Sequence, residues 1–165
     1  MKKVPLKRKR PIGRPPKYRA PKQKIEKELD DLWSKVITQK GVCELKGIDG
    51  RECKLRLTGA HIISRNYKIT RWDYENGICL CWGHHYYYTH HAEEWKMRVD
   101  QIRSEGYYQR IWERAWNNGQ KAVLDLEAIK QNLIKAIRTA YIDSFMQHLT
   151  NSKEWKDIME AKKCL

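Results

Sequence analysis

The segment of residues 78–91 constrains the fold of this chain more than any other, because it concentrates Cys, His and Tyr side chains. Five of the six histidines of the 165-residue chain lie between His61 and His91, which is far denser than core packing requires. An ordinary buried strand or helix is built from aliphatic side chains and does not need this chemistry. The composition of the segment therefore indicates a functional site.

The spacing of Cys81 and His84 is typical of a zinc site. They form a Cys-x-x-His pair, which lets both ends of a tight turn bind one tetrahedral Zn²⁺. A second pair must come from upstream, where Cys43 is a suitable third ligand, although Lys46 occupies the position where a Cys-x-x-Cys knuckle would place the next. Cys53, which lies ten residues after Cys43 and just before the strand that leads to His61, is the simplest choice of fourth ligand. The predicted structural zinc site is therefore Cys43, Cys53, Cys81 and His84.

The alternative to a zinc site is that the cysteines are simply buried. We expect no secretory leader, and the five cysteines are therefore not expected to form disulfides. Cys79 and Cys164 are predicted not to be ligands. Zinc ligation would join two loops of a small domain and would contribute folding free energy directly.

Histidine and asparagine occur in the order His, Asn, His along the central part of the chain. The segments that contain them are GAHIISR from Gly59, TRWDYENG from Thr70 and CLCWGHH from Cys79, followed by EEWKMRVDQIRSEGYYQRI. Over about residues 24–120 they resemble the HNH endonuclease family, and in particular the NinG-like phage recombination proteins and related phage HNH nucleases. The resemblance implies an α+β fold with a small zinc-stabilised ββα-metal core and flanking helices. It also implies a metal-dependent DNA endonuclease encoded by a phage or mobile element.

The resemblance further implies a function for each residue of the motif. His61 matches the general base that activates water, at the end of a first strand. Asn76 matches the loop residue that either orients this base through backbone hydrogen bonds or ligates the catalytic metal. His85 matches the metal-binding histidine at the start of a helix, with His90 as a candidate second ligand. The catalytic ion would be Mg²⁺ or Mn²⁺, in addition to the structural Zn²⁺.

Two positions depart from the family pattern and keep other functions open. Ala60 stands where many HNH nucleases have an Asp or His ligand, and Thr89 stands four residues after His85, where another ligand would fall. The first alternative is a zinc-stabilised DNA-binding protein without catalysis. A second, which we rank lower, is an RNA-binding or assembly factor, because the tyrosines of residues 86–88 could stack on unpaired bases.

The positive charge of the chain is concentrated at its N-terminus. The formal net charge is +14, and residues 1–24 contain 11 Lys and Arg and no acidic residue. A basic arm is typical of a protein that binds nucleic acid, and Gly13-Arg14-Pro15 resembles an AT-hook. The arm could instead be a solubilising tail or an import signal. Arg65 and Arg71, which lie in the predicted domain, could be ordinary surface charges. The predicted DNA contacts are Arg8, Arg10, Arg14, Lys17, Arg65 and Arg71.

Apolar periodicity predicts helices on both sides of the histidine motif. Residues 25–37, 95–102 and 107–116 each show helical spacing, and Asp125 could cap a longer helix. The apolar stripe of that last helix is Ile129, Leu133, Ile137, Tyr141 and Phe145. Alternation predicts a hairpin strand in residues 53–58, with residues 61–63 as a second strand.

The predicted organisation is a basic arm (1–24), a nuclease domain (25–120) and a C-terminal helical extension (121–165) that could support a homodimer. No apolar run approaches the roughly 18 residues of a membrane span. We therefore expect an intracellular protein without a membrane partner, located in the host cytoplasm if a phage encodes it.

Overall fold

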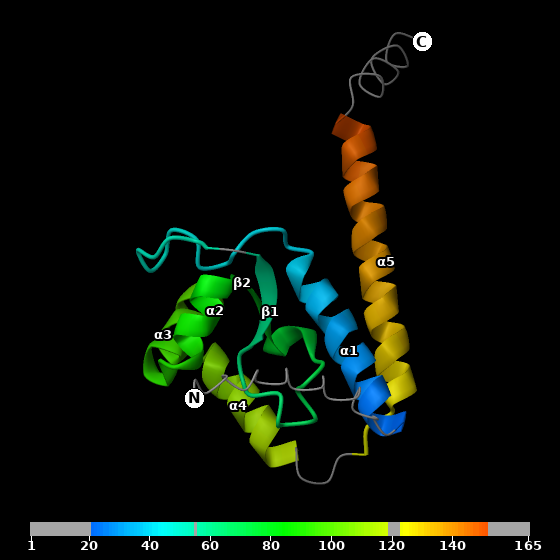
Figure 1. Cartoon of the computed structure of the whole chain (residues 1–165), viewed down its shortest axis with the longest axis horizontal. Helices are drawn as coiled ribbons and strands as arrows, with labels where there is room; N and C mark the ends of the chain where they lie inside the picture. Colours follow the sequence, from blue (N-terminus) through cyan, green and yellow to red (C-terminus); the bar gives the residue numbers. More distant parts are fainter. Residues whose placement is uncertain (1–20, 55, 119–122, 152–165) are drawn as a thin grey trace, which may run out of the picture.

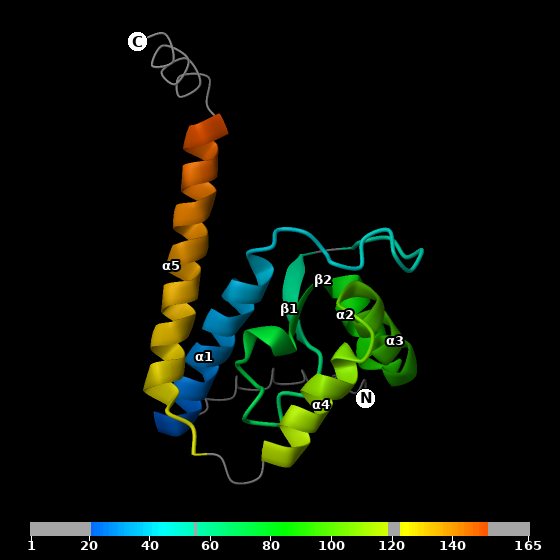
Figure 2. The same ribbon diagram turned by 180° about the vertical axis from the view of Figure 1, so that it is seen from behind.

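The computed structural model describes residues 21–54, 56–118 and 123–151, and Figures 1 and 2 show it from opposite sides. Over these residues the chain is α+β, as predicted, with five α-helices and a two-stranded sheet. None of the described helices is long and apolar enough to cross a membrane. The elements are α1 (Pro21–Thr38), β1 (Leu57–His61), the 3-10 helix η1 (Tyr74–Asn76), β2 (Gly77–Cys81), α2 (Trp82–Thr89), α3 (Ala92–Ile102), α4 (Tyr107–Asn118) and α5 (Leu126–Asn151).

The antiparallel pair of β1 and β2 lies in the middle of the molecule, with α1 on one side and α2 and α3 on the other (Figure 1). The register pairs Thr58 with Leu80 and His61 with Gly77. β2 runs directly into α2, so the central unit has the order strand, loop, strand, helix.

Two glycines let α1 approach the sheet closely. A Cβ atom on Gly77 would lie 2.2 Å from Cδ1 of Ile37, and one on Gly59 would lie 3.0 Å from Cζ3 of Trp33. Both strands therefore present bare backbone where the helix crosses them. The buried side chains of α1 are Leu29, Trp33, Val36 and Ile37.

The other face of the sheet packs against α2, α3 and α4. Ala60 and Ile78 are paired across the strands and are buried in this second core. Helix side chains that complete it are Tyr88, Trp95, Val99, Ile111 and Ala115. The two-stranded sheet is thus covered on both sides, which an isolated hairpin needs for stability.

α5 packs along α1 and extends past its end (Figure 2). The carboxylate of Asp125 accepts a hydrogen bond from the backbone N–H of Ala128 at 2.9 Å, as expected for the predicted cap. Leu133 is buried against α1, whereas Tyr141 is 72% exposed, so the predicted stripe meets α1 over the first part of α5. The side chain of Phe145 lies outside the described residues, and the homodimer stays a prediction.

The bounds of the predicted strands are wrong. Leu57, Thr58 and His61 belong to one strand, β1, which pairs with residues 77–81, whereas Ile62 and Ile63 lie outside it. The carbonyls of Lys54 and Arg56 instead accept hydrogen bonds from Gly83 and Trp82, at 3.4 and 2.9 Å, and so satisfy the start of α2. β2 is buried at all five positions, so it has no alternation that could identify it as a strand.

Candidate metal centre and histidine site

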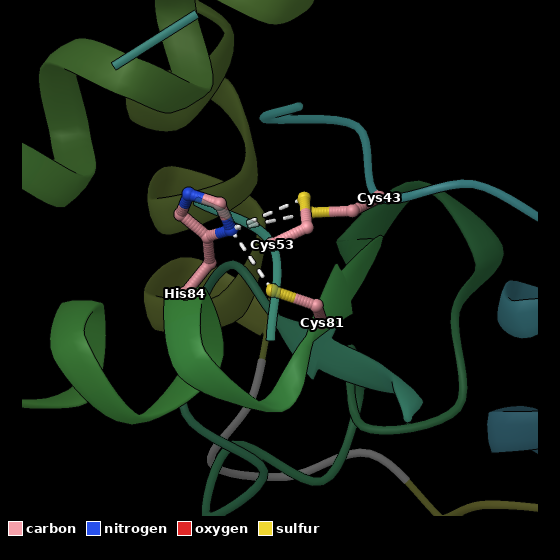
Figure 3. Close-up of side chains that lie close together, drawn as sticks. All are labelled: Cys43, Cys53, Cys81 and His84. Carbon is pink, nitrogen blue, oxygen red and sulfur yellow. Dashed lines mark hydrogen bonds between the residues drawn. The ribbon is translucent and has the colours of Figure 1, made fainter. Parts of the chain in front are cut away.

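The four side chains predicted as zinc ligands lie together in one cluster, which we call the zinc cluster (Figure 3). The Nδ1 atom of His84 lies 3.0 Å from the sulfur of Cys81, 3.4 Å from that of Cys43 and 3.9 Å from that of Cys53. All four ligand atoms lie within 4.8 Å of one another. These residues could therefore hold a metal ion such as zinc.

The zinc cluster joins a loop to the central strand and helix. Cys43 and Cys53 lie in the segment between α1 and β1, while Cys81 ends β2 and His84 lies in the first turn of α2. Gly47 and Gly50 have φ angles of 77° and 74°, which let this segment turn back on itself between its two cysteines. Cys79 is buried against α1, apart from the cluster, and Cys164 lies outside the described residues.

The chemistry of these donors suits zinc. A tetrahedral Zn²⁺ spaces sulfur and nitrogen ligands about 3.5 to 3.8 Å apart, close to the distances observed. Burial raises the pKa of the Cys81 thiol, but hydrogen bonds from the backbone N–H groups of His84 and Lys54 outweigh burial and bring it to about 7. Cys53 is exposed as a residue, but desolvation of its thiol within the cluster and the neighbouring Cys43 thiol raise its pKa to about 12. A divalent cation in the cluster would favour the thiolate form of each sulfur.

Asp49, which the sequence analysis did not single out, orients the imidazole of His84. The Nε2–H group of His84 donates to the Asp49 carboxylate at 3.1 Å, so Nδ1 presents its lone pair to the sulfurs. The hydroxyl of Tyr88 donates to the other carboxylate oxygen at 2.7 Å, and the Asp49 side chain is 2% exposed. Asp-Gly is a common turn signal, so the sequence could not distinguish this function from a turn.

His61 ends β1, and its ring is held on two sides. Nε2 lies 2.8 Å from the carbonyl oxygen of Arg71; because a carbonyl can only accept, Nε2 carries the proton and Nδ1 carries the lone pair. The ring stacks on the indole of Trp33 with 3.9 Å between centroids and 11° between planes. Burial lowers the pKa of His61 below its ordinary value of 6.5. The ring is therefore neutral at pH 7 and can accept a proton at Nδ1.

Asn76 is fully buried and holds the loop between the two strands. Its Oδ1 atom accepts from the N–H of Ile63 at 2.7 Å, and its Nδ2 group donates to the carbonyls of Ile63 and Thr70 at 3.0 and 2.9 Å. These hydrogen bonds organise the loop backbone that follows His61. Both predicted functions of Asn76, orienting the general base and binding the catalytic metal, stay predictions.

His85 lies on α2 and contacts the neighbouring strand. Its Nδ1 atom lies 2.9 Å from the hydroxyl oxygen of Thr58, and that hydroxyl donates its own proton to the carbonyl of Leu80 at 3.2 Å. Thr58 therefore accepts from Nδ1–H of His85, which leaves the lone pair on Nε2. Burial lowers the pKa of His85 below 6.5. A neutral imidazole with one nitrogen held in this way is the form that binds metal ions.

His85 belongs to no group of three or more described His, Cys, Asp or Glu side chains whose ligand atoms lie within 4.8 Å of one another, and the zinc cluster is the one such group. His90 is exposed and contacts the ring of Tyr86, and its ligand function stays a prediction. The hydroxyl of Thr89 donates to the carbonyl of His85 at 2.7 Å, and Ala60 is 2% exposed.

The arginines predicted to contact DNA have different surroundings. Both carboxylate oxygens of Asp30 accept hydrogen bonds from the guanidinium of Arg71, at 2.9 and 2.7 Å, so the structure shows an internal ion pair for this side chain. Its phosphate contact stays a prediction, as does that of Arg65, which is exposed. Residues 21–24 of the predicted arm form the first turn of α1. The arm residues Arg8, Arg10, Arg14 and Lys17 lie outside the described residues.

Comparison with models of known protein families, with curated proteins and with solved structures gives no significant match to this chain. The function proposed below is therefore supported by the residues and contacts of this chain and by the motif order in its sequence.

Proposed function

We propose that this protein is a metal-dependent DNA endonuclease of the HNH type, which hydrolyses phosphodiester bonds. The observation that supports this most strongly is the pair of neutral, oriented imidazoles, His61 and His85, on a unit of strand, loop, strand and helix. Phosphodiester hydrolysis needs a base for water and a nitrogen for a divalent ion, and each ring has one free lone pair. Asn76 holds the loop that connects the two strands.

In the proposed reaction His61 is the general base. Nδ1 accepts a proton from the attacking water, and the carbonyl of Arg71 keeps its hydrogen bond to Nε2–H and stabilises the ring when it becomes charged. The stacked indole of Trp33 limits rotation of the ring. Because burial lowers the pKa of His61, the base stays unprotonated at neutral pH.

His85 would hold the divalent ion, Mg²⁺ or Mn²⁺, through Nε2. When bound, the ion supplies positive charge to the phosphate as negative charge develops on its oxygens. No group of three described His, Cys, Asp or Glu side chains includes His85, so these residues do not complete a site for the ion. The step assigned to this chain is therefore the proton transfer at His61.

The charge of the chain supports DNA as the substrate. The net charge of +14 favours association with a polyanion through release of counterions. Arg65 is exposed in the loop that follows His61, where it could contact a phosphate next to the scissile bond. Most of the excess charge belongs to residues 1–24, which would add affinity through contacts to phosphates.

A zinc-stabilised DNA-binding protein without catalysis is the second candidate function. Two observations favour it: Ala60 is buried in an apolar core, and the hydroxyl of Thr89 is bound to its own helix. Neither position offers a ligand for a catalytic ion. In this case the Cys and His side chains would maintain the fold, and the basic residues alone would perform the function.

Plasmid relaxation by the full chain distinguishes these functions. Parent protein and His61→Ala are assayed with EDTA, Mg²⁺ or Mn²⁺, and zinc content is measured on the same samples. A nuclease nicks the plasmid only with the divalent ion, and loss of its general base lowers the rate about 10²- to 10⁴-fold. His91→Ala is the matched control, because it removes an exposed imidazole that stacks on Tyr87.

Two results would decide against the nuclease. Equal relaxation by the parent and His61→Ala contradicts a catalytic function of His61. A zinc-loaded parent that binds DNA but does not cleave it with either ion supports the second candidate.

A further inference from the structure

Asp30 of α1 holds the loop segment that contacts His61. Its carboxylate accepts hydrogen bonds from Nε and Nη2 of Arg71, at 2.9 and 2.7 Å, and from Nε1 of Trp72 at 2.9 Å. One side chain thus binds two consecutive loop residues that follow it by 41 and 42 positions. Glu26, one turn earlier on α1, places a second carboxylate 3.7 Å from Arg71.

The same loop segment provides the hydrogen-bond acceptor of His61. The carbonyl of Arg71 lies 2.8 Å from Nε2 of the imidazole. Trp33, which follows Asp30 by one turn of α1, stacks on this imidazole and donates its Nε1–H to the carbonyl of Asp73 at 2.9 Å. One face of α1 therefore contacts the ring of His61 and residues 71–73.

The contact between Asp30 and Arg71 can fix the position of the loop backbone at Arg71, whose carbonyl faces His61. A guanidinium that donates two hydrogen bonds to one carboxylate is held in position as well as in orientation. The side chains of Arg71 and Asp30 are 17% and 26% exposed, so the pair is partly shielded from solvent. Asn76 holds the adjacent residue Thr70 from the inside of the loop. The carbonyl of Arg71 thus lies between two fixed contacts, the hydrogen bond of Asn76 to Thr70 and the ion pair of Arg71 with Asp30.

We propose that Asp30 is a positioning residue for the general base. Through Arg71 it keeps the backbone carbonyl on Nε2–H of His61, and so it keeps Nδ1 free for the attacking water. This inference rests on the proposed function of His61. It makes α1 a part of the proposed active site in addition to its packing against the sheet.

The test is Asp30→Asn in the full zinc-loaded chain, with Asp31→Asn as the matched control. Asparagine keeps the size of the side chain and an acceptor for Trp72, but it loses the charge that pairs with Arg71. Asp31 is the next residue of the same helix, its side chain is 60% exposed, and its carboxylate pairs with Lys27. The control therefore removes an equal charge without changing the contact to Arg71.

The first measurement is the tautomer of His61, read from the ¹⁵N chemical shifts of its ring. We expect one Nε2–H tautomer in the parent and in Asp31→Asn, and a mixture of two tautomers in Asp30→Asn. The second measurement is plasmid nicking, in which kcat of Asp30→Asn should fall by up to about 10²-fold with little change in KM, because the orientation of a base affects the chemical step.

Arg71→Gln is a second route to the same result. It removes the other partner of the ion pair, so it should give the same mixture of tautomers as Asp30→Asn, and the double variant should add little. It also keeps the test decisive if Asp30→Asn does not fold, which circular dichroism and zinc content report.

The outcomes separate this inference from the proposed function. An unchanged His61 tautomer in folded Asp30→Asn and Arg71→Gln overturns the positioning function of Asp30, whatever the nuclease assay shows. A parent that cleaves no DNA, while the tautomer still depends on Asp30, overturns the proposed nuclease instead.

Discussion

Three imidazoles of this protein have three different hydrogen-bond partners. His61 donates to a backbone carbonyl, His84 donates to the carboxylate of Asp49, and His85 donates to the hydroxyl of Thr58. Each partner determines which ring nitrogen keeps its lone pair. His84 faces three sulfurs with that lone pair, whereas His61 and His85 keep theirs for a proton and for an ion in the proposed reaction.

At this scale we expect Asp49→Asn to weaken zinc binding by about 10- to 100-fold, because mutation of a residue that orients a metal-binding histidine typically lowers metal affinity by this factor. The amide keeps the shape of the side chain but loses the charge that stabilises Nε2–H of His84. Competition with a chromophoric zinc chelator measures the affinity. Glu52→Gln, an exposed position in the same segment, is the control. Equal affinities for the two variants would contradict the orienting function of Asp49.

At the scale of elements, α1 connects the packing of the domain to the histidine site. Its contact with the sheet depends on Gly77, whose position directly across from His61 brings the helix side chains close to the strand backbone. Trp33 reaches the imidazole because the helix lies so near. The approach of α1 to the sheet and the stacking on His61 are therefore consequences of the same geometry.

We expect Gly77→Ala to lower the free energy of unfolding by about 1 to 3 kcal/mol, since the new methyl group would overlap the side chain of Ile37. Urea denaturation measures this change. Gly83→Ala is the control, because its nearest neighbouring atom would be 3.5 Å away, an ordinary contact. The losses from Gly77→Ala and Ile37→Ala should be less than additive in the double variant, because Ile37→Ala removes the side chain that the new methyl group would overlap. Equal stability of Gly77→Ala and the parent would mean that α1 can shift from the sheet at no cost.

At the scale of the whole molecule, the zinc cluster joins a long irregular segment to the central sheet and helix. The segment between α1 and β1 contains no helix or strand in its described residues, and it supplies Cys43 and Cys53 to the cluster. Apolar packing covers the two faces of the sheet, but this segment has few buried side chains of its own. A bound metal ion would thus stabilise the part of the domain with the least core.

Removal of zinc should therefore destabilise the protein. At free zinc about 1,000 times Kd, binding contributes about 4 kcal/mol, which corresponds to a fall in Tm of roughly 8 to 16 °C on chelation. Calorimetry of the zinc-loaded and chelated chain measures the difference, and added zinc should restore Tm. An equal Tm with and without zinc would contradict a structural function of the cluster and favour the alternative that its cysteines are only buried.

The sequence by itself predicted four of the five described α-helices and the four residues of the zinc cluster. The helices and the pair of Cys81 and His84 depend on local spacing. Cys43 and Cys53 were predicted instead as the upstream cysteines that could complete the site. Asp125 was recognisable as a cap because its contact reaches a residue three positions away. The order of His61, Asn76 and His85 was also readable, although what it implies for catalysis stays a proposal.

Only the tertiary structure decided which strands pair and which carboxylates support the histidines. β2 has no alternation because both of its faces are buried, so no local pattern distinguished it from other core segments. Asp49 reaches His84 across 35 positions and Asp30 reaches Arg71 across 41. The chain has 20 acidic residues, and nothing in their local surroundings separates these two from the rest. Contacts at such separations exist only after packing brings α1, the loop and α2 together.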